Sequence, residues 1–282
     1  MKLARYLLEQ QEIALPYLNK DIALGRDIVL SNERTDLSFT QDWYPEGYKV
    51  YKAFDQDEFM SMRKSVENAV TSIMKKELNL SSVDFNLEDY HSFVPTDQDH
   101  YKIVSRARDL FSHDFSFPIL SCLERLGELV KTKLTDLNPQ TGHRIHIIIR
   151  INRPKSHDFN PPHKDIYGDY EGNVVSSPNF INFWIPICGV TRNSSLPIAP
   201  GSHLFPESEI ERSLSGAIIG GNRYRVNLVL NWGGSNRLSR TNLDAGEALC
   251  FSPHLIHGLA ANQESDQTRV ALELRLYEDM KS

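Results

Sequence analysis

The stretch HRIHIIIRIN, residues 143–152, indicates the fold class of this 282-residue chain. Isoleucine stands at each odd position from 145 to 151, and polar residues stand at most even positions. Successive side chains of a strand point to opposite faces, so this period of two predicts a half-buried strand. The same alternation returns in three later stretches: residues 181–187, 226–230 and 270–276. Several such strands, joined by turns rich in Gly, Pro, Asn and Ser, predict a double-sheet jelly roll.

Apolar residues before position 142 recur instead at helical spacing. Asp55 and Glu58 form a capping-box pattern ahead of an apolar stripe, which predicts a helix over about residues 55–77. A second apolar stripe predicts a helix over about residues 116–134. Residues 78–114 show no sustained period, and we expect loop with short helical turns there.

These patterns predict one domain spanning residues 1–282, mainly β with flanking helices. We expect residues 142–277 to form its core, a double-stranded β-helix of the cupin-like jelly-roll kind. Residues 1–141 are expected to support this core with helices and irregular segments. The aromatic residues around the turn at 45–47 either pack as an outer strand or help to close a substrate pocket.

The composition is that of an ordinary folded protein, with 40% hydrophobic and 24% charged residues. A net charge of −6 gives no basic footprint for nucleic acid or for an anionic membrane, so we expect neither partner. The chain shows no signal-peptide pattern and no run of about 18 apolar residues, so we expect it in the cytoplasm. Three scattered cysteines favour buried thiols over disulfides or a cysteine-rich zinc site.

The stretch PPHKD, residues 161–165, carries the first chemical signal. On an extended chain, His163 and Asp165 lie on one face with their Cα atoms about 7 Å apart, close enough for both side chains to bind one small cation. Because such a triplet also arises by chance, a further ligand is needed to support a metal site.

The candidates for that further ligand are His254 and His257. Their offset of three places them on opposite faces of a regular strand, so only one of them can reach the metal. Gly258 favours His257, because a glycine allows a close approach of backbone or cosubstrate. Two histidines and one carboxylate, with open coordination positions, suit non-haem iron(II) oxygen chemistry.

Two more stretches have distinctive sequences: LPIAPGSH at residues 196–203, and AGEALCF at 245–251 followed by His257, Asn262 and Arg269. Together with PHKD, they resemble the motifs of the phytanoyl-CoA dioxygenase-like family of iron(II)- and 2-oxoglutarate-dependent oxygenases. This resemblance covers about half of the chain and implies the jelly-roll fold.

The same resemblance implies a ligand set and a reaction. His163, Asp165 and His257 would bind Fe(II), and Arg269 would pair with the C5 carboxylate of 2-oxoglutarate. O2 would be the second cosubstrate, and a small organic molecule would be oxidised with release of succinate and CO2. The oxidation could be a hydroxylation, a desaturation or a ring-forming step, and Asp165 argues against halogenation because related halogenases have a small residue there.

A planar guanidinium at Arg269 can make a two-pronged pair with a carboxylate, which a lysine cannot copy. The family often has Ser or Thr two residues later, whereas Ala271 stands here, so another group must complete the carboxylate contacts. Arg150, Asn152 and Asn182 are candidates for binding the C1 end of 2-oxoglutarate or the substrate. Their alternative role is ordinary interior hydrogen bonding.

Two irregular segments are expected to line the mouth of the site: residues 155–179, with Tyr167, Asp169 and Tyr170, and residues 204–240. The second segment carries five arginines: 212, 223, 225, 237 and 240. They either favour an anionic or hydroxyl-rich small-molecule substrate or form a solvated face.

Two other classes of function remain open on the sequence alone. One is a jelly-roll module that binds a metal or a sugar without turnover, and the other is a metal-dependent isomerase or hydrolase on a cupin-like barrel. Neither needs Arg269.

Overall fold

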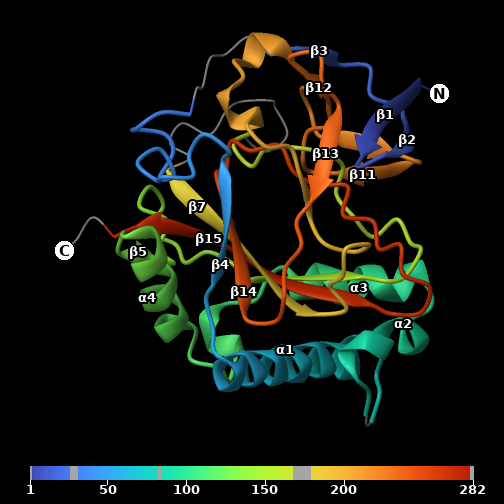
Figure 1. Cartoon of the computed structure of the whole chain (residues 1–282). Helices are drawn as coiled ribbons and strands as arrows, with labels where there is room; N and C mark the ends of the chain where they lie inside the picture. Colours follow the sequence, from blue (N-terminus) through green and yellow to red (C-terminus); the bar gives the residue numbers. More distant parts are fainter. Residues whose placement is uncertain (1, 26–30, 82–83, 168–178, 280–282) are drawn as a thin grey trace.

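The computed structural model of the chain describes residues 2–25, 31–81, 84–167 and 179–279. Its strands form two six-stranded sheets and one three-stranded sheet (Figure 1). The first, called the major sheet, has the order β4-β14-β7-β15-β5, with β6 paired to β15. Its strands are β4 (Tyr48–Lys52), β14 (Glu247–Phe251), β7 (Phe180–Cys188), β15 (Arg269–Glu278), β5 (Leu134–Thr135) and β6 (Ile148–Asn152).

The second six-stranded sheet, called the minor sheet, has the order β11-β10-β2-β1-β13-β8. Its strands are β11 (Asn222–Tyr224), β10 (Ala217–Ile219), β2 (Gln11–Tyr17), β1 (Lys2–Leu8), β13 (Arg237–Arg240) and β8 (Pro197–Ile198). The three-stranded sheet consists of β12 (Val229–Trp232), β9 (Ile210–Ser213) and β3 (Ile22–Leu24). These curved sheets confirm the mainly β, jelly-roll architecture.

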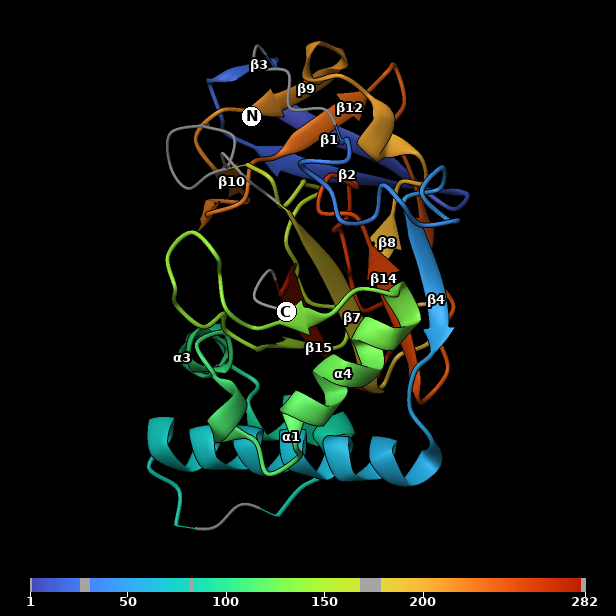
Figure 2. The ribbon, with the colours of Figure 1, turned by 90° about the vertical axis from the view of Figure 1, so that its left-hand side faces the viewer.

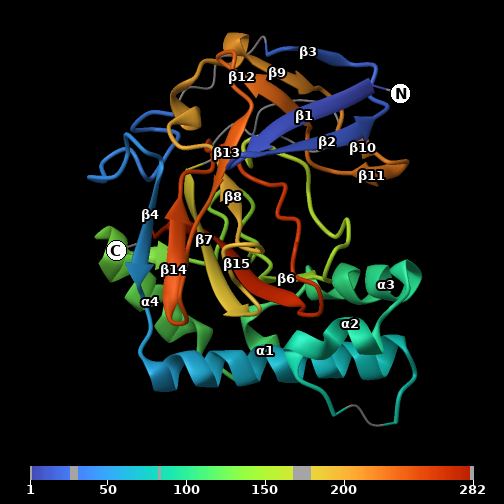
Figure 3. The same cartoon turned by 45° about the vertical axis from the view of Figure 1, so that its right-hand side comes forward.

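The described residues form four α-helices, which lie on the side of the major sheet that faces away from the minor sheet (Figures 2 and 3). They are α1 (Gln56–Glu77), α2 (Tyr90–Phe93), α3 (Asp97–Ala107) and α4 (Ile119–Val130). Short 3-10 helices are η1 (Leu87–Asp89), η2 (Ser112–Asp114), η3 (Ser202–Leu204) and η4 (Glu207–Glu209). None of the described helices is long and apolar enough to cross a membrane.

Helix α1 begins as the sequence predicts. The backbone N–H of Glu58 donates to the Asp55 carboxylate at 2.9 Å, and the Glu58 carboxylate accepts from the Asp55 N–H at 3.0 Å. This capping box satisfies two N–H groups that a helix start leaves without partners. The second predicted helix is shorter than expected, because α4 begins at Ile119 and strand β5 already includes Leu134.

Residues 78–114 are expected to be loop with short helical turns, and η1, α2 and η2 fit that expectation, whereas α3 is a regular helix of 11 residues. Its buried positions are His100, Ile103, Val104 and Ala107. Their spacing is helical, but a histidine and an alanine at core positions hide the apolar period in the sequence. Thr96 caps the helix by accepting from the Asp99 N–H at 3.1 Å.

The expectation of helical and irregular structure for residues 1–141 does not hold for residues 2–24, which form β1, β2 and β3. The strand predicted from position 143 is also shorter, because only residues 148–152 form the continuous strand β6. Residues 48–52 form β4 at the edge of the major sheet, which fits the outer-strand interpretation of the aromatic residues.

The main hydrophobic core fills the space between the helices and the major sheet. One face of β15, with Val270, Leu272, Leu274 and Leu276, packs into this core. The other face of β15 points to the interior between the sheets, as the alternation of a strand requires. The three cysteines are buried and free, as the sequence predicts.

Candidate metal centre

His163 and His257 lie opposite each other on two short extended segments. The His163 N–H donates to the His257 carbonyl at 2.9 Å, and the His257 N–H donates to the His163 carbonyl at 3.0 Å. Two residues that exchange both hydrogen bonds present their side chains on the same face. The ring centroids are 4.3 Å apart. The fold therefore places two imidazoles side by side, although they are far apart in the sequence.

The hydrogen bonds of the two rings fix which nitrogens are free. Nδ1 of His163 lies 2.8 Å from the Pro161 carbonyl, and Nδ1 of His257 lies 3.0 Å from the Leu255 carbonyl. Because a carbonyl oxygen can only accept, each Nδ1 carries the proton and each Nε2 keeps its lone pair. Burial, together with the neighbouring His257, lowers the pKa of His163 to about 3, so that ring is neutral at pH 7.

Asp165 completes the cluster. Its Oδ1 lies 3.6 Å from Nε2 of His163, and its Oδ2 lies 3.6 Å from Nε2 of His257. One ligand atom from each of the three residues lies within 4.8 Å of the others. Two imidazoles and one carboxylate are the donor set typical of non-haem iron(II), so the residues present fit that metal.

Strands β7 and β15 hold the Asp165 carboxylate from the major sheet. Arg275 donates from Nη2 to Oδ1 at 2.7 Å, and Asn182 donates from Nδ2 to Oδ2 at 2.9 Å. These two residues are direct partners across the strand pair. Burial acts to raise the pKa of Asp165, but Arg275 and the two histidines outweigh it, so the pKa lies below its ordinary value. The carboxylate is therefore ionised and fixed in orientation.

Arg269 lies in the cavity that His163, His257 and Trp184 also line. It is 2% exposed, and its Nη2 donates to the Ala260 carbonyl at 3.1 Å. Its Nε has no hydrogen-bond partner, and no carboxylate of the described residues pairs with it. Burial, and then the neighbouring Arg240 and Arg150, lowers the pKa of Arg269 to about 9. A desolvated cation of this kind gains stability when an anion binds beside it.

The other polar residues predicted for this cavity make internal contacts. Arg150 donates to both Glu273 carboxylate oxygens, at 2.7 and 3.1 Å. Asn152 donates to the Asp158 and Ala260 carbonyls, and Asn182 holds Asp165 as described above. The structure thus gives all three residues interior hydrogen bonding, which the sequence left as the alternative to binding 2-oxoglutarate.

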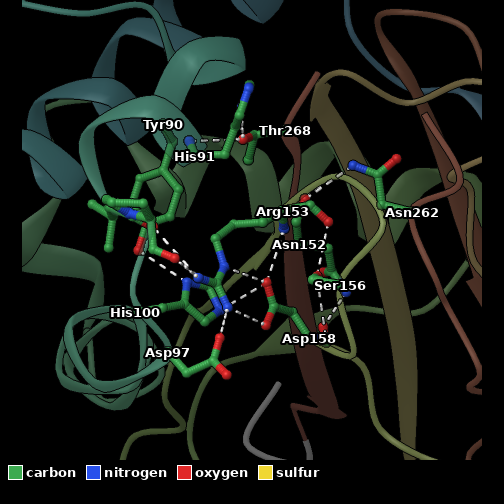
Figure 4. A network of polar contacts seen from close by, with 12 residues as sticks. Tyr90, His91, Asp97, His100, Asn152, Arg153, Ser156, Asp158, Asn262 and Thr268 are labelled. Atoms are coloured by element: carbon green, nitrogen blue, oxygen red, sulfur yellow. Dashed lines mark hydrogen bonds and ion pairs between the residues drawn. The ribbon is translucent and has the colours of Figure 1, made fainter. Parts of the chain in front are cut away.

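A network of polar contacts adjoins the cavity through Asp158, which lines it (Figure 4). Arg153 donates to both oxygens of Asp158, at 2.9 and 3.1 Å, and to Asp97 at 2.5 Å. His100 lies with its Nε2 3.3 Å from Asp158, and burial lowers the pKa of His100 to about 4. Since Asp97 and His100 belong to α3 and Asp158 lines the cavity, the network attaches this helix to the wall of the site.

His254 lies apart from the cluster of ligand atoms. Its Nε2 is 3.0 Å from the Thr35 carbonyl, so its ring is directed to the loop before β4. His203 also hydrogen-bonds to a backbone carbonyl, with its Nε2 2.6 Å from the Tyr44 oxygen. The geometry therefore favours His257 over His254 as a ligand, as the sequence does.

The five arginines of the predicted mouth divide into two groups. Arg212 is buried and donates to Glu207 at 3.0 Å, and Arg240 donates to the carbonyls of Ser195 and Ala261. Arg240 is half-buried, so of these two residues only Arg212 is withdrawn from solvent. Three are exposed, as on a solvated face: arginines 223, 225 and 237. Asp169 and Tyr170 lie outside the described residues.

Sequence reasoning missed the contact of Arg275 with Asp165. The alternation in β15 places Arg269, Glu273 and Arg275 on one face, which is a usable signal. Which of them meets a ligand depends on the pairing of β15 with β7, and a single sequence does not show that register.

Comparison with known proteins agrees with this site. The model of the family described as phytanoyl-CoA dioxygenase (PhyH) matches residues 46–271, which include the three clustered residues and Arg269. No curated protein sequence matches the chain.

Solved structures resemble the chain at low identity. EctD from S. alaskensis, in complex with 2-oxoglutarate and 5-hydroxyectoine, is 13% identical, with 93% of this chain and 86% of that chain covered and a TM-score of 0.49. EvdO2 from Micromonospora carbonacea var. aurantiaca, complexed with 2-oxoglutarate, is 14% identical, with coverages of 90% and 94% and a TM-score of 0.46. AviO1 from Streptomyces viridochromogenes Tue57 is 12% identical, with coverages of 84% and 92% and a TM-score of 0.46.

The family match spans most of the chain, and the donor set of the cluster fits the metal of that family. The chain therefore belongs to the phytanoyl-CoA dioxygenase (PhyH) family, with ferrous iron as cofactor and 2-oxoglutarate and O2 as cosubstrates.

Proposed function

We propose that the protein is an iron(II)- and 2-oxoglutarate-dependent dioxygenase that oxidises a small organic molecule and releases succinate and CO2. The observation that carries this proposal is the buried guanidinium of Arg269, which shares a cavity with His163 and His257. A site that only bound a metal would not need an uncompensated cation beside it, whereas a dianionic cosubstrate does.

In this proposal, the Nε2 atoms of His163 and His257 and the carboxylate of Asp165 hold the iron. Iron bound there would supply oxygen activation coupled to the oxidative decarboxylation of 2-oxoglutarate. The carbonyls of Pro161 and Leu255 keep both rings in the ligating tautomer. Arg275 and Asn182 prevent the Asp165 carboxylate from rotating, because each carboxylate oxygen accepts one hydrogen bond.

Arg269 would bind the C5 carboxylate of 2-oxoglutarate. Its guanidinium lies 5.6 Å from the centroid of Trp184, and it retains an unused Nε donor. Ala271, on the same face of β15, offers no hydroxyl to assist this contact. The low exposure of Arg269 excludes water, so a charge-assisted pair there is stronger than at the surface.

The carboxylate ligand Asp165 favours hydroxylation, desaturation or ring formation over halogenation.

Following the sequence prediction, we also propose that residues 1–282 act as one domain in the cytoplasm.

Anaerobic titration with Fe(II) and 2-oxoglutarate tests this function. We expect a visible metal-to-ligand charge-transfer band, followed on exposure to O2 by slow formation of succinate without added substrate. Zinc should occupy the site without supporting succinate formation. The absence of the band at saturation would reject the proposal, and equal activity with zinc would favour the isomerase or hydrolase alternative.

A further inference from the structure

Lys164 stands between the two proposed ligands His163 and Asp165, and its side chain points the opposite way. On an extended segment, alternate side chains leave on opposite faces. The Lys164 ammonium reaches Glu207, with Nζ 3.2 Å from Oε1, and both side chains are 0% exposed. A lysine with no solvent contact is rare unless it is paired.

Glu207 is the centre of a larger buried cluster. Arg212 donates from Nε to its Oε2 at 3.0 Å, and the Tyr167 hydroxyl donates to its Oε1 at 3.0 Å. The Arg212 guanidinium lies 4.1 Å from the centroid of the Tyr167 ring. The cluster therefore contains two cations and one carboxylate, a composition that does not favour stability by itself.

The backbone of the segment that carries the ligands is held at isolated points and not along a continuous strand. Apart from the exchange between His163 and His257, the Asp165 N–H donates to Pro253 at 3.0 Å, and the Pro162 carbonyl accepts from Val229 at 2.8 Å. It forms only isolated bridges rather than a continuous strand. Side-chain anchors therefore add to these backbone contacts in fixing the position of the ligands.

Two such anchors act from opposite sides. Arg275 and Asn182 hold Asp165 from the major sheet, while Glu207 holds Lys164 from η4, next to β9 of the three-stranded sheet. We propose that Lys164 is a positioning residue, which fixes the two proposed ligands on either side of it through its buried pair with Glu207. This inference rests on the proposed metal site and goes beyond it, because it concerns a residue that does not touch the metal.

The variant Lys164→Met separates positioning from stability. Methionine keeps much of the length of the side chain, and the loss of Lys164 leaves Glu207 paired with Arg212, so no buried charge is left without a counter-charge. We therefore expect a folded protein with a melting temperature close to that of the wild type. If the ligands are no longer held in place, the affinity for the metal should fall although the melting temperature does not.

The probe is Co(II), bound anaerobically in place of iron, because its visible d–d absorption reports the coordination geometry. In Lys164→Met we expect Co(II) affinity to fall about 10–100-fold, the usual result of removing a group that orients a ligand, with an altered d–d spectrum. Isothermal titration gives the affinity, and thermal unfolding without metal gives the stability.

Arg63→Met is the matched control. It breaks a partly buried ion pair on α1, in which Arg63 Nη2 lies 2.8 Å from Glu88. We expect it to lower the melting temperature while leaving the affinity and spectrum of Co(II) unchanged. A structural role for Lys164 would move only the melting temperature, as in this control.

Wild-type affinity and spectrum in Lys164→Met would overturn the inference. If that variant does not fold, Tyr167→Phe, which removes one hydrogen bond to Glu207, replaces it. The expected result is then a smaller shift in the same direction, and an unchanged affinity and spectrum again overturns the inference. Failure of the wild-type protein to bind Co(II) would instead count against the proposed function, so the two failures are distinguishable.

Discussion

The two ends of the inner face of β15 carry the same residue type in opposite electrostatic surroundings. Arg275 lies 2.7 Å from Asp165 and 3.1 Å from Glu273, whereas no described carboxylate pairs with Arg269. Burial opposes the charge at both ends, but at Arg275 the two carboxylates outweigh it and raise the pKa. At Arg269, burial lowers the pKa to about 9. The difference teaches that charge compensation, and not residue type or strand face, separates Arg269, the proposed anion-binding residue, from Arg275, which supports Asp165.

Removal of a proposed ligand should have the largest effect on activity. Arg269 and Arg275, at the two ends of β15, are both proposed to act at the metal site, so loss of the metal removes the function of both. We expect His163→Ala, Asp165→Ala and His257→Ala each to abolish iron binding and turnover with little change in fold. His254→Ala is the matched control, since its ring hydrogen-bonds to the Thr35 carbonyl away from the cluster. Metal titration and succinate release measure the outcome, and loss of metal in His254→Ala with normal binding in His257→Ala would reverse our assignment.

Arg269→Ala should remove only the proposed binding of the 2-oxoglutarate carboxylate. Truncation of one partner of a buried charge pair should weaken 2-oxoglutarate binding by about 2–5 kcal/mol, while iron affinity stays nearly unchanged. Arg269→Lys should recover only part of the loss, because a point charge replaces a two-pronged contact. Isothermal titration of 2-oxoglutarate into the Mn(II)-loaded variants measures this, and unchanged affinity would transfer the role to another cation.

Arg275→Met should affect the Asp165 end of β15 and have a smaller effect. It should weaken metal binding and leave 2-oxoglutarate binding nearly unchanged, the reverse of Arg269→Ala. Without its 2.7 Å hydrogen bond, Asp165 keeps only the Asn182 contact and rotates more freely. Metal affinity should fall by roughly 10–100-fold, while 2-oxoglutarate affinity of the metal-saturated protein changes little. If Arg275→Met instead weakened 2-oxoglutarate as much as Arg269→Ala does, the contrast between the two ends would be wrong.

Lowering the pH should have the smallest effect, and it tests whether Glu273 compensates the charge of Arg275. Burial acts to raise the pKa of Glu273, but Arg150 and Arg275 outweigh it, so the folded-state pKa lies below the ordinary value of 4.5. The stability that Glu273 contributes is therefore complete above pH 4.5 and is lost as the pH falls further. One such group changes the free energy of unfolding by at most about 1.4 kcal/mol per pH unit.

The variant Glu273→Gln removes that titration. Urea unfolding between about pH 5 and about pH 3 should show a shallower dependence on pH in the variant than in the wild type. Equal slopes would mean that Glu273 has an ordinary pKa and that Arg275 is not compensated as the structure indicates.

Local patterns in the sequence predicted the parts of the fold that depend on neighbouring residues. The capping box of Asp55 and Glu58 marked the start of α1, and the alternation in residues 270–276 marked both faces of β15. The proposed ligands and Arg269 were found from motif spacing and family resemblance. The structure clusters the three ligands, and His163, His257 and Arg269 line one cavity.

The sequence did not show features that depend on a distant partner. The hairpin of β1 and β2 takes its place in the minor sheet by pairing with β13 and β10, which follow far later in the chain. The burial of Arg212 depends on Glu207 and Tyr167 closing over it. An arginine in a polar segment looks the same in sequence whether it faces solvent or a buried carboxylate.

The parallel pairing of β1 with β13 has a consequence for the order of folding. Leu7 and Leu8 pair with Arg237 and Leu238, so a very long loop must close before this contact forms. Strand β13 pairs with β8 through Ser239 and Ile198, and Ile198 in turn bridges to His257. Non-local pairings of this kind form late in refolding. The capacity to bind a metal should therefore appear after the helical signal, so that refolding followed by Co(II) absorbance lags behind refolding followed by circular dichroism.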